Sequence, residues 1–161
     1  MSYEIEYLAD HPHHLPTVAK WYWQEWDRHE GWDIERSTSF AEQGCNKDKL
    51  DIILIAMNDS QDCIGTIQLR EEWGLGDEIP QKLREYSPWL GSLYVHPDYR
   101  FKKLGFDLCE QIKKAAIEIG IKSCYAATSH LDQFFKLRNG VKIDSVNFAN
   151  EDMGIFKFSL N

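Results

Sequence analysis

Residues 90–106 read Leu-Gly-Ser-Leu-Tyr-Val-His-Pro-Asp-Tyr-Arg-Phe-Lys-Lys-Leu-Gly-Phe, a strand pattern that passes through a short loop into a helix pattern. We expect a strand over 89–95 that ends before Pro97, because proline has no amide hydrogen to donate to a sheet. Apolar residues recur at helical spacing over 104–119, and Gly120 is expected to close that helix. The sequence therefore predicts a strand–loop–helix unit here.

The loop of this unit has the properties of an anion site. The first amides of a helix have no internal partners, and the helix macrodipole adds partial positive charge at the same place. Three cationic side chains stand beside these amides: Arg100, Lys102 and Lys103. We therefore expect the loop to bind a diphosphate.

In this setting the chain resembles the general N-acetyltransferase (GNAT) superfamily. The acetyl-CoA motif of that superfamily is a strand, then Val-x-Pro-x-x-Arg/Gln-x-x-Gly-x-Gly/Ala, then a helix, and Val95, Pro97, Arg100 and Gly105 match it in spacing. The run 88–90, Pro-Trp-Leu, also resembles a group of bacterial acetyltransferases with loosely defined substrates. The resemblance implies a mixed α/β (α+β) fold over 1–161, one N-acetyltransferase domain. Its central sheet would be mostly antiparallel, with about 6–7 strands flanked by about four helices.

The resemblance also implies a role for individual residues. Backbone groups of Leu93, Tyr94 and Val95 would pair with the pantetheine arm, and one of their amides would polarise the thioester carbonyl. The cosubstrate would be acetyl-CoA, no metal would take part, and a neutral primary amine of a small molecule or peptide would attack the thioester directly. The amides that would hold the pyrophosphate belong to Phe101, Lys102, Lys103, Leu104, Gly105 and Phe106.

Three features depart from the superfamily pattern. The first glycine of the motif is Lys103, whose side chain could point outward and add a phosphate contact or could indicate a weakened site. The tyrosine that protonates the thiolate in many relatives falls on Lys136, or on Phe135 if one residue is inserted, and Phe135 would then line the pantetheine channel. No general base is evident. Glu71 and Glu72 are the nearest acidic candidates, and a solvated strand end or a water relay are the alternatives.

The rest of the chain supports the same fold through alternating strand and helix patterns. A long connection is expected over 71–88, with a short helix at 81–86. The expected order is β-α-α-β-β-β-α-β-α-β-β. The other expected strands are 3–8, 51–57, 63–70, 122–128, 141–146 and 153–158, the last two joined by 147–152, and the other expected helices begin at Leu15, cover 34–43 and cover 131–137.

Composition limits the partners. The 161 residues are 43% hydrophobic and carry a net charge of −8, which disfavours nucleic acids and anionic membranes and suits a cationic amine. No apolar run reaches the roughly 18–20 residues that cross a bilayer, and no signal peptide is evident, so we expect a cytoplasmic protein. The four cysteines form no CxxC pair, and the resemblance leaves a homodimer open.

Aromatic residues gather near the first helix. The resemblance places this region beside the acceptor groove, where an aromatic wall can hold a cation, although packing alone would also explain it. Two other functions stay open: a non-catalytic acyl-CoA-binding regulatory protein of the same fold, and an interaction module that uses this aromatic face. The group is Trp21, Tyr22, Trp23, Trp26 and Trp32.

Overall fold

A computed structural model of the protein describes residues 2–73 and 79–161. Seven strands form one sheet in the order β1-β2-β3-β4-β5-β7-β6. Neighbouring strands are antiparallel except for β4 and β5, which are parallel, so the predicted mixed and mostly antiparallel sheet is confirmed. The strands are β1 (Tyr3–Tyr7), β2 (Ile52–Asn58), β3 (Cys63–Arg70), β4 (Trp89–Val95), β5 (Ser123–Thr128), β6 (Val141–Phe148) and β7 (Glu151–Ser159).

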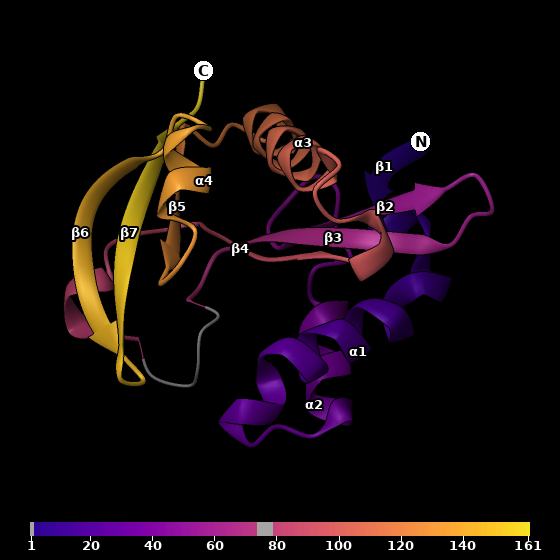
Figure 1. Ribbon diagram of the computed structural model, residues 1–161, viewed down its shortest axis with the longest axis horizontal. Coiled ribbons are helices and arrows are strands. Elements are labelled where there is room, and N and C mark those ends of the chain that lie inside the picture. The colour runs from indigo at the N-terminus through magenta and orange to yellow at the C-terminus, as the bar shows by residue number, and fades with distance from the viewer. Residues whose placement is uncertain (1, 74–78) are drawn as a thin grey trace.

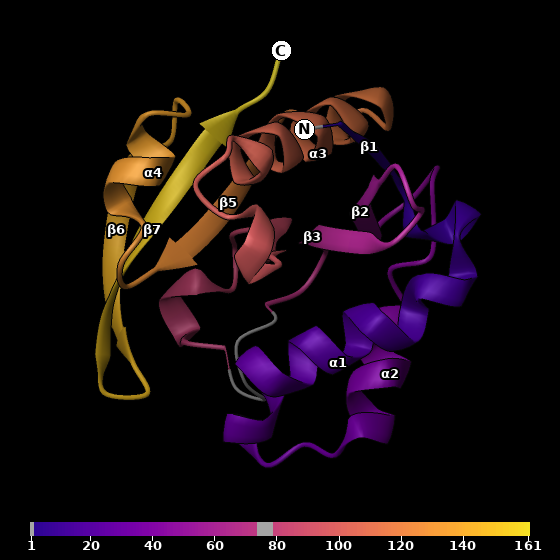
Figure 2. The same ribbon diagram turned by 45° about the vertical axis from the view of Figure 1, so that its right-hand side comes forward.

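Helices cover both faces of the sheet in the predicted order. Helix α3 lies on one face, and α1 and α2 lie on the other (Figures 1 and 2). No helix in the described part of the chain is both long and apolar enough to cross a bilayer. The α-helices are α1 (Leu15–Glu25), α2 (Ile34–Glu42), α3 (Leu104–Glu118) and α4 (Asp132–Lys136).

Local sequence explains where these helices begin. Pro16 lies in the first turn of α1, where a missing amide hydrogen costs no helical bond. Asp33 precedes α2 and accepts a hydrogen bond of 2.8 Å from the amide of Arg36, which caps that helix. Helix α3 turns an apolar stripe inward, and its members Leu104, Leu108 and Ile112 are at most 1% exposed.

Two core layers hold the sheet between the helices. The layer under α3 includes Ile67 and Leu69 of β3, while the layer under α1 and α2 includes Ile53 and Ile55 of β2. Each fully buried side chain of this kind contributes about 1.5–3 kcal/mol through burial, so both layers are major sources of stability. The sheet is thereby a fixed platform for the loops at its strand ends.

Two expected boundaries were wrong. The final hairpin has longer strands than expected, and only Ala149 and Asn150 connect β6 to β7, with φ of 52° and 64°. Such a two-residue turn with positive φ suits the twist of a hairpin, but alanine gives no sequence signal for it. The helix expected at 81–86 is a short 3-10 turn over Gln81–Leu83. Residues 74–78 of the expected connection lie outside the described residues.

Candidate functional site

Strands β4 and β5 separate after a single pair. Their register contains only Trp89 opposite Tyr125, and the amide of Tyr125 donates to the carbonyl of Pro88 at 2.9 Å. Beyond this point the two ribbons run apart (Figure 1). The edge of β4 that faces β5 therefore has no ladder partner over 91–95, as the resemblance implied for Leu93, Tyr94 and Val95. An extended ligand could pair with this edge as an added strand.

A β-bulge lies within the same part of β4. Thr66 of β3 pairs with Tyr94 and Gln68 pairs with Gly91, so Ile67 alone is opposite both Ser92 and Leu93. Ser92 has a φ of 49°, an uncommon conformation for a residue other than glycine. Bulges change the direction in which the following backbone groups point and are frequent beside active sites. The bulge therefore sets the direction of the free edge that follows it.

The loop from β4 to α3 presents unpaired amides. Lys103 precedes α3 with φ of 75°, and the first helical hydrogen bond runs from the amide of Asp107 to the carbonyl of Lys103 at 3.0 Å. The amides of Leu104, Gly105 and Phe106 precede that bond and have no helical partner. A left-handed residue followed by right-handed ones makes successive amides converge, which favours an anion.

Positive charge surrounds these amides. The Nε of Arg100 donates to the carbonyl oxygen of Val95 at 2.7 Å, which ties the loop back to β4. The Nζ of Lys102 donates to the carbonyl of Asp98 at 3.2 Å, and all three cationic side chains are exposed. The Lys103 ammonium points outward to Asp107, 3.5 Å from its Oδ1. The left-handed backbone of Lys103 explains why the superfamily motif has glycine there.

Gly105 lies where β4, α3 and α4 meet. A Cβ atom added to Gly105 would lie 3.9 Å from Cδ2 of Leu93 and 3.9 Å from Cζ of Phe134. A methyl group therefore fits at this position, while a large side chain would fill the space between these three elements. Phe101 projects from the same loop and is fully exposed.

Sequence reasoning did not identify Phe134 and Arg138. The Arg138 guanidinium stacks 3.9 Å from the Phe134 ring and 4.6 Å from the Phe106 ring, and its Nη1 donates to the Phe134 carbonyl. Phe135, the residue suggested for the channel wall, is 5% exposed and packs against Phe156 in the core. Two adjacent phenylalanines on a short helix give no sequence signal for which one faces the loop. The position of Phe134 makes it the better candidate, and a channel role for Phe135 stays a prediction.

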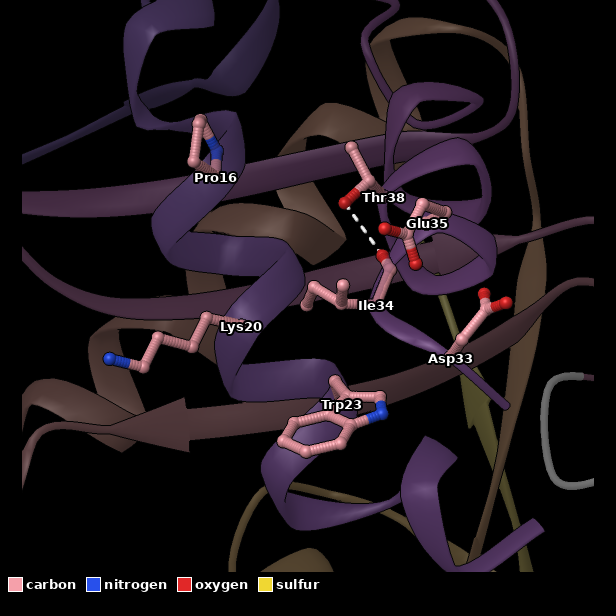
Figure 3. A pocket seen from close by; sticks show the side chains of 7 residues that line it. All are labelled: Pro16, Lys20, Trp23, Asp33, Ile34, Glu35 and Thr38. Carbon is pink, nitrogen blue, oxygen red and sulfur yellow. Dashed lines mark hydrogen bonds between the residues drawn. The ribbon is translucent and has the colours of Figure 1, made fainter. Parts of the chain in front are cut away.

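The aromatic residues of α1 divide between two surroundings. Trp21 lies against Tyr94 of β4, with ring centroids 4.6 Å apart, and it is 7% exposed. The Nε1 of Trp23 donates to the carbonyl of Trp32. Trp23 also lines an open hollow of about 740 Å³ between α1 and α2, in front of the sheet in Figure 3. The residues that line this hollow are Pro16, Lys20, Trp23, Asp33, Ile34, Glu35 and Thr38.

The two candidate bases lie at the other end of β4. Glu71 and Glu72 are exposed and directly follow β3, whose last residue, Arg70, is opposite Trp89. The Glu71 amide donates to Oδ1 of Asp51 at 2.7 Å. Trp89 and Tyr94 are about 16 Å apart along a strand at the usual rise per residue. The glutamates would therefore act through intervening water, and their catalytic role stays a prediction.

A second open hollow borders the cationic loop. It measures about 700 Å³ and is lined by Ser2, Tyr3, Lys102, Lys103 and Asp107. The Tyr3 hydroxyl donates to the Asp107 carboxylate, and burial together with that carboxylate raises the pKa of Tyr3 to about 12. Tyr3 therefore stays protonated at neutral pH and links β1 to the start of α3.

Three histidines, at positions 11, 13 and 14, lie together in the turns that precede α1. The rings of His13 and His14 lie 4.2 Å apart and contact that of His11. Over residues 2–73 and 79–161, no group of three or more His, Cys, Asp or Glu side chains could hold a metal ion.

Known structures share this architecture. A crystal structure of an aminoglycoside 6'-N-acetyltransferase complexed with coenzyme A is 14% identical, covers 99% of this chain and 97% of its own, and has a TM-score of 0.74. The aminoglycoside 6'-N-acetyltransferase from Enterococcus faecium is also 14% identical, with coverage of 97% and 96% and a TM-score of 0.70. The yncA protein from Salmonella typhimurium, with its cofactor acetyl-CoA, is 13% identical, with coverage of 100% and 95% and a TM-score of 0.69. At these identities the likeness concerns the fold.

Comparison of the sequence with known proteins and family models assigns the chain to a family more directly. Comparison with curated proteins gives no match. The model of the acetyltransferase (GNAT) family matches residues 15–135, which include α1, α2, the cationic loop and all of α3. The separated strands and the loop at the start of α3 lie inside the matched range. The chain belongs to the GNAT family of acetyltransferases.

Proposed function

We propose that the protein transfers the acetyl group of acetyl-CoA to a primary amine of a small molecule or a peptide. The observation that carries this proposal is the continuity of two features. The unpaired edge of β4 over 91–95 leads directly into the loop whose free amides and cations suit a diphosphate. A coenzyme that joins an amide-containing arm to a diphosphate has the chemistry to use both.

The chain's own residues would hold acetyl-CoA in two places. The backbone of Leu93, Tyr94 and Val95 would pair with the pantetheine arm, because this edge lacks strand partners. The amides of Leu104, Gly105 and Phe106 would bind the pyrophosphate, with exposed cations around them. The ring of Phe134, close to Gly105, would limit the width of the channel.

The reaction needs only positioning and proton transfer. A neutral amine attacks the thioester carbonyl carbon, a carbon–nitrogen bond forms, the carbon–sulfur bond breaks and the coenzyme leaves as a thiolate. The attacking nitrogen loses one proton, which passes through water at the Glu71 and Glu72 end of β4 to solvent, and the thiolate takes one proton from solvent, so that no net proton is gained or lost. An amide of β4 after the bulge would donate to the carbonyl oxygen as negative charge develops there, which lowers the barrier.

The class of acceptor and the side from which it would enter are inferred from the charge of the chain and from the position of two aromatic residues. The chain has a net charge of −8, although three cations cluster at the loop. An acidic surface attracts cationic amines. Trp21 and Tyr94 form an aromatic pair at the reactive part of β4, where they would contact an acceptor that enters from the side of α1.

The test is acetyl-CoA-dependent thiol release with a panel of amines that includes aminoglycosides, polyamines and short peptides. Thermal unfolding with acetyl-CoA in hundredfold excess over its dissociation constant should raise Tm by roughly 5–10 °C. Thiol release that depends on one amine class would support the proposal. Tight coenzyme binding with no release above background would instead favour a non-catalytic binding protein. No coenzyme affinity would reject both functions.

A further inference from the structure

Gln68 is a polar side chain held deep inside the protein. It lies on the face of β3 that is turned toward α1 and α2, and it is 3% exposed. Its Oε1 has no hydrogen-bond partner among the described residues. Burying an unpaired polar atom is costly, so a leucine would be the cheaper choice for packing alone.

The other end of the Gln68 amide holds the bulge of β4. Its Nε2 donates to Oγ of Ser92 at 2.7 Å. Ser92 is one of the two bulge residues opposite Ile67 and has the left-handed φ of 49°. The hydrogen bond thus reaches the residue whose conformation defines the bulge.

The left-handed conformation of Ser92 needs such support. Residues with a Cβ atom avoid positive φ, and serine has no special tolerance for it. A net hydrogen bond of ordinary strength corresponds to about a two- to tenfold change in population. The bond from Gln68 is therefore strong enough to decide how fully the bulge is formed.

We propose that Gln68 is a positioning residue that acts through Ser92 to aim the backbone of Leu93 and Tyr94 at the thioester. This inference rests on the proposed function, because it gives the bulge a role in acetyl transfer. Gln68 does not itself contact the coenzyme. Its effect should fall on the chemical step, since the diphosphate loop is a separate segment of the chain.

The first variant is Gln68→Leu, which keeps the size of the side chain and removes the hydrogen bond. We expect kcat for acetyl transfer to fall three- to tenfold, while KM for acetyl-CoA changes less than twofold. In the coenzyme-free protein, backbone resonances of Ser92, Leu93 and Tyr94 should shift. A variant that is merely less stable, with kcat and these resonances unchanged, would overturn the proposal.

The second variant tests the mechanism by rescue. Glycine adopts positive φ readily, so it does not need the support of Gln68. The double variant Gln68→Leu with Ser92→Gly should therefore recover most of the lost kcat, and the resonances of Leu93 and Tyr94 should move back toward their original positions. A folded double variant that stays as slow as Gln68→Leu would contradict the proposal.

Thr66→Val is the matched control. Thr66 is on the same face of β3 and is 0% exposed, but its hydroxyl donates to Leu54 of β2 at 2.9 Å, away from the bulge. This variant should lose stability and keep its kcat within twofold. The resonance shifts separate the two proposals. If the parent protein releases no thiol, acetyl transfer is rejected while the shifts still test whether Gln68 holds the bulge.

Discussion

The two faces of strand β3 meet very different surroundings. Toward α3 the strand presents Ile67 and Leu69, which join an apolar layer. Toward α1 and α2 it presents Thr66, Gln68 and Arg70, which are at most 6% exposed. One strand thus supports a hydrophobic core on one side and a buried polar row on the other.

The two faces of β3 therefore differ in what they contribute to the protein. The apolar side fixes α3 and hence the cationic loop at its start. The polar side keeps groups that cost stability: Arg70 binds Asp51 at 3.2 Å, while its Nε and the Tyr22 hydroxyl have no hydrogen-bond partner in the described chain. Buried polar groups with incomplete pairing call for a functional explanation. Gln68 of this row is the residue for which we propose such a role.

The largest expected effect is on the loop that the apolar side supports. Gly105→Trp should lower affinity for acetyl-CoA at least a hundredfold, because the indole would fill the space beside Leu93 and Phe134. Isothermal titration with acetyl-CoA measures it. Gly105→Ala is the control, since a Cβ atom there meets no atom closer than 3.9 Å, and it should keep its affinity within about threefold. Unchanged affinity in a folded Gly105→Trp variant would remove the coenzyme from this loop.

A pair of core variants compares the two faces directly. Leu108→Ala under α3 should lower the free energy of unfolding by about 2–5 kcal/mol, because it leaves a cavity in a fully buried layer. Tyr22→Phe on the opposite face should instead raise it by about 1–3 kcal/mol, because it removes a buried hydroxyl that has no hydrogen-bond partner among the described residues. Urea denaturation measures both. A large loss for Tyr22→Phe would show that the polar face is tightly paired after all.

Lys103→Gly tests the position where the motif departs from the family. Glycine removes the strain of φ at 75°, which costs lysine about 1–2 kcal/mol, and part of this gain is lost to the greater freedom of glycine in the unfolded chain. We expect thermal unfolding to show unchanged or slightly higher stability. Affinity for acetyl-CoA should stay within about threefold, because the ammonium points toward Asp107. A tenfold loss would place that ammonium on a phosphate.

The smallest expected effect concerns Asp27, buried between α1 and α2. Burial raises the pKa of its carboxyl, although Ser37 donates to it at 2.7 Å. Its stabilising contribution is complete below the ordinary aspartate pKa of about 4 and is lost as the pH rises through the folded value. In urea denaturation, Asp27→Asn should therefore lose less stability than the parent between about pH 4 and 7. Asp59→Asn, an exposed carboxyl in a turn, should leave that pH dependence unaltered.

Local patterns were enough to predict most of the fold. The strands over 63–70 and 89–95 were predicted with the observed bounds, because alternation and a following proline mark them clearly. The cationic loop was located from its motif spacing. The buried polar row of β3 was not, since alternating polar residues ordinarily indicate a solvent-facing side. Its burial depends on α1 and α2, which are distant in sequence.

The details of the site depended on long-range packing. The bulge at Ser92 arises from the register between β3 and β4, and no residue type in 90–95 announces it. The choice between Phe134 and Phe135 depends on how a five-residue helix is rotated against the sheet. The spacing of residues in the sequence is enough to locate the loop. It does not predict the bulge at Ser92 or which phenylalanine faces the loop.

The separation of β4 from β5 also bears on how the protein avoids aggregation through exposed strand edges. Its sheet has rim edges on β1 and β6, and further unpaired edges lie within it where β4 and β5 separate. Rim edges can recruit strands from foreign sheets. The inner edge of β4 covers only 91–95 and lies within the sheet, so it offers pairing to a single extended segment, whereas the edges on β1 and β6 lie at the rim. The fold thereby keeps backbone groups that can pair with an extended molecule inside the sheet and not at its rim.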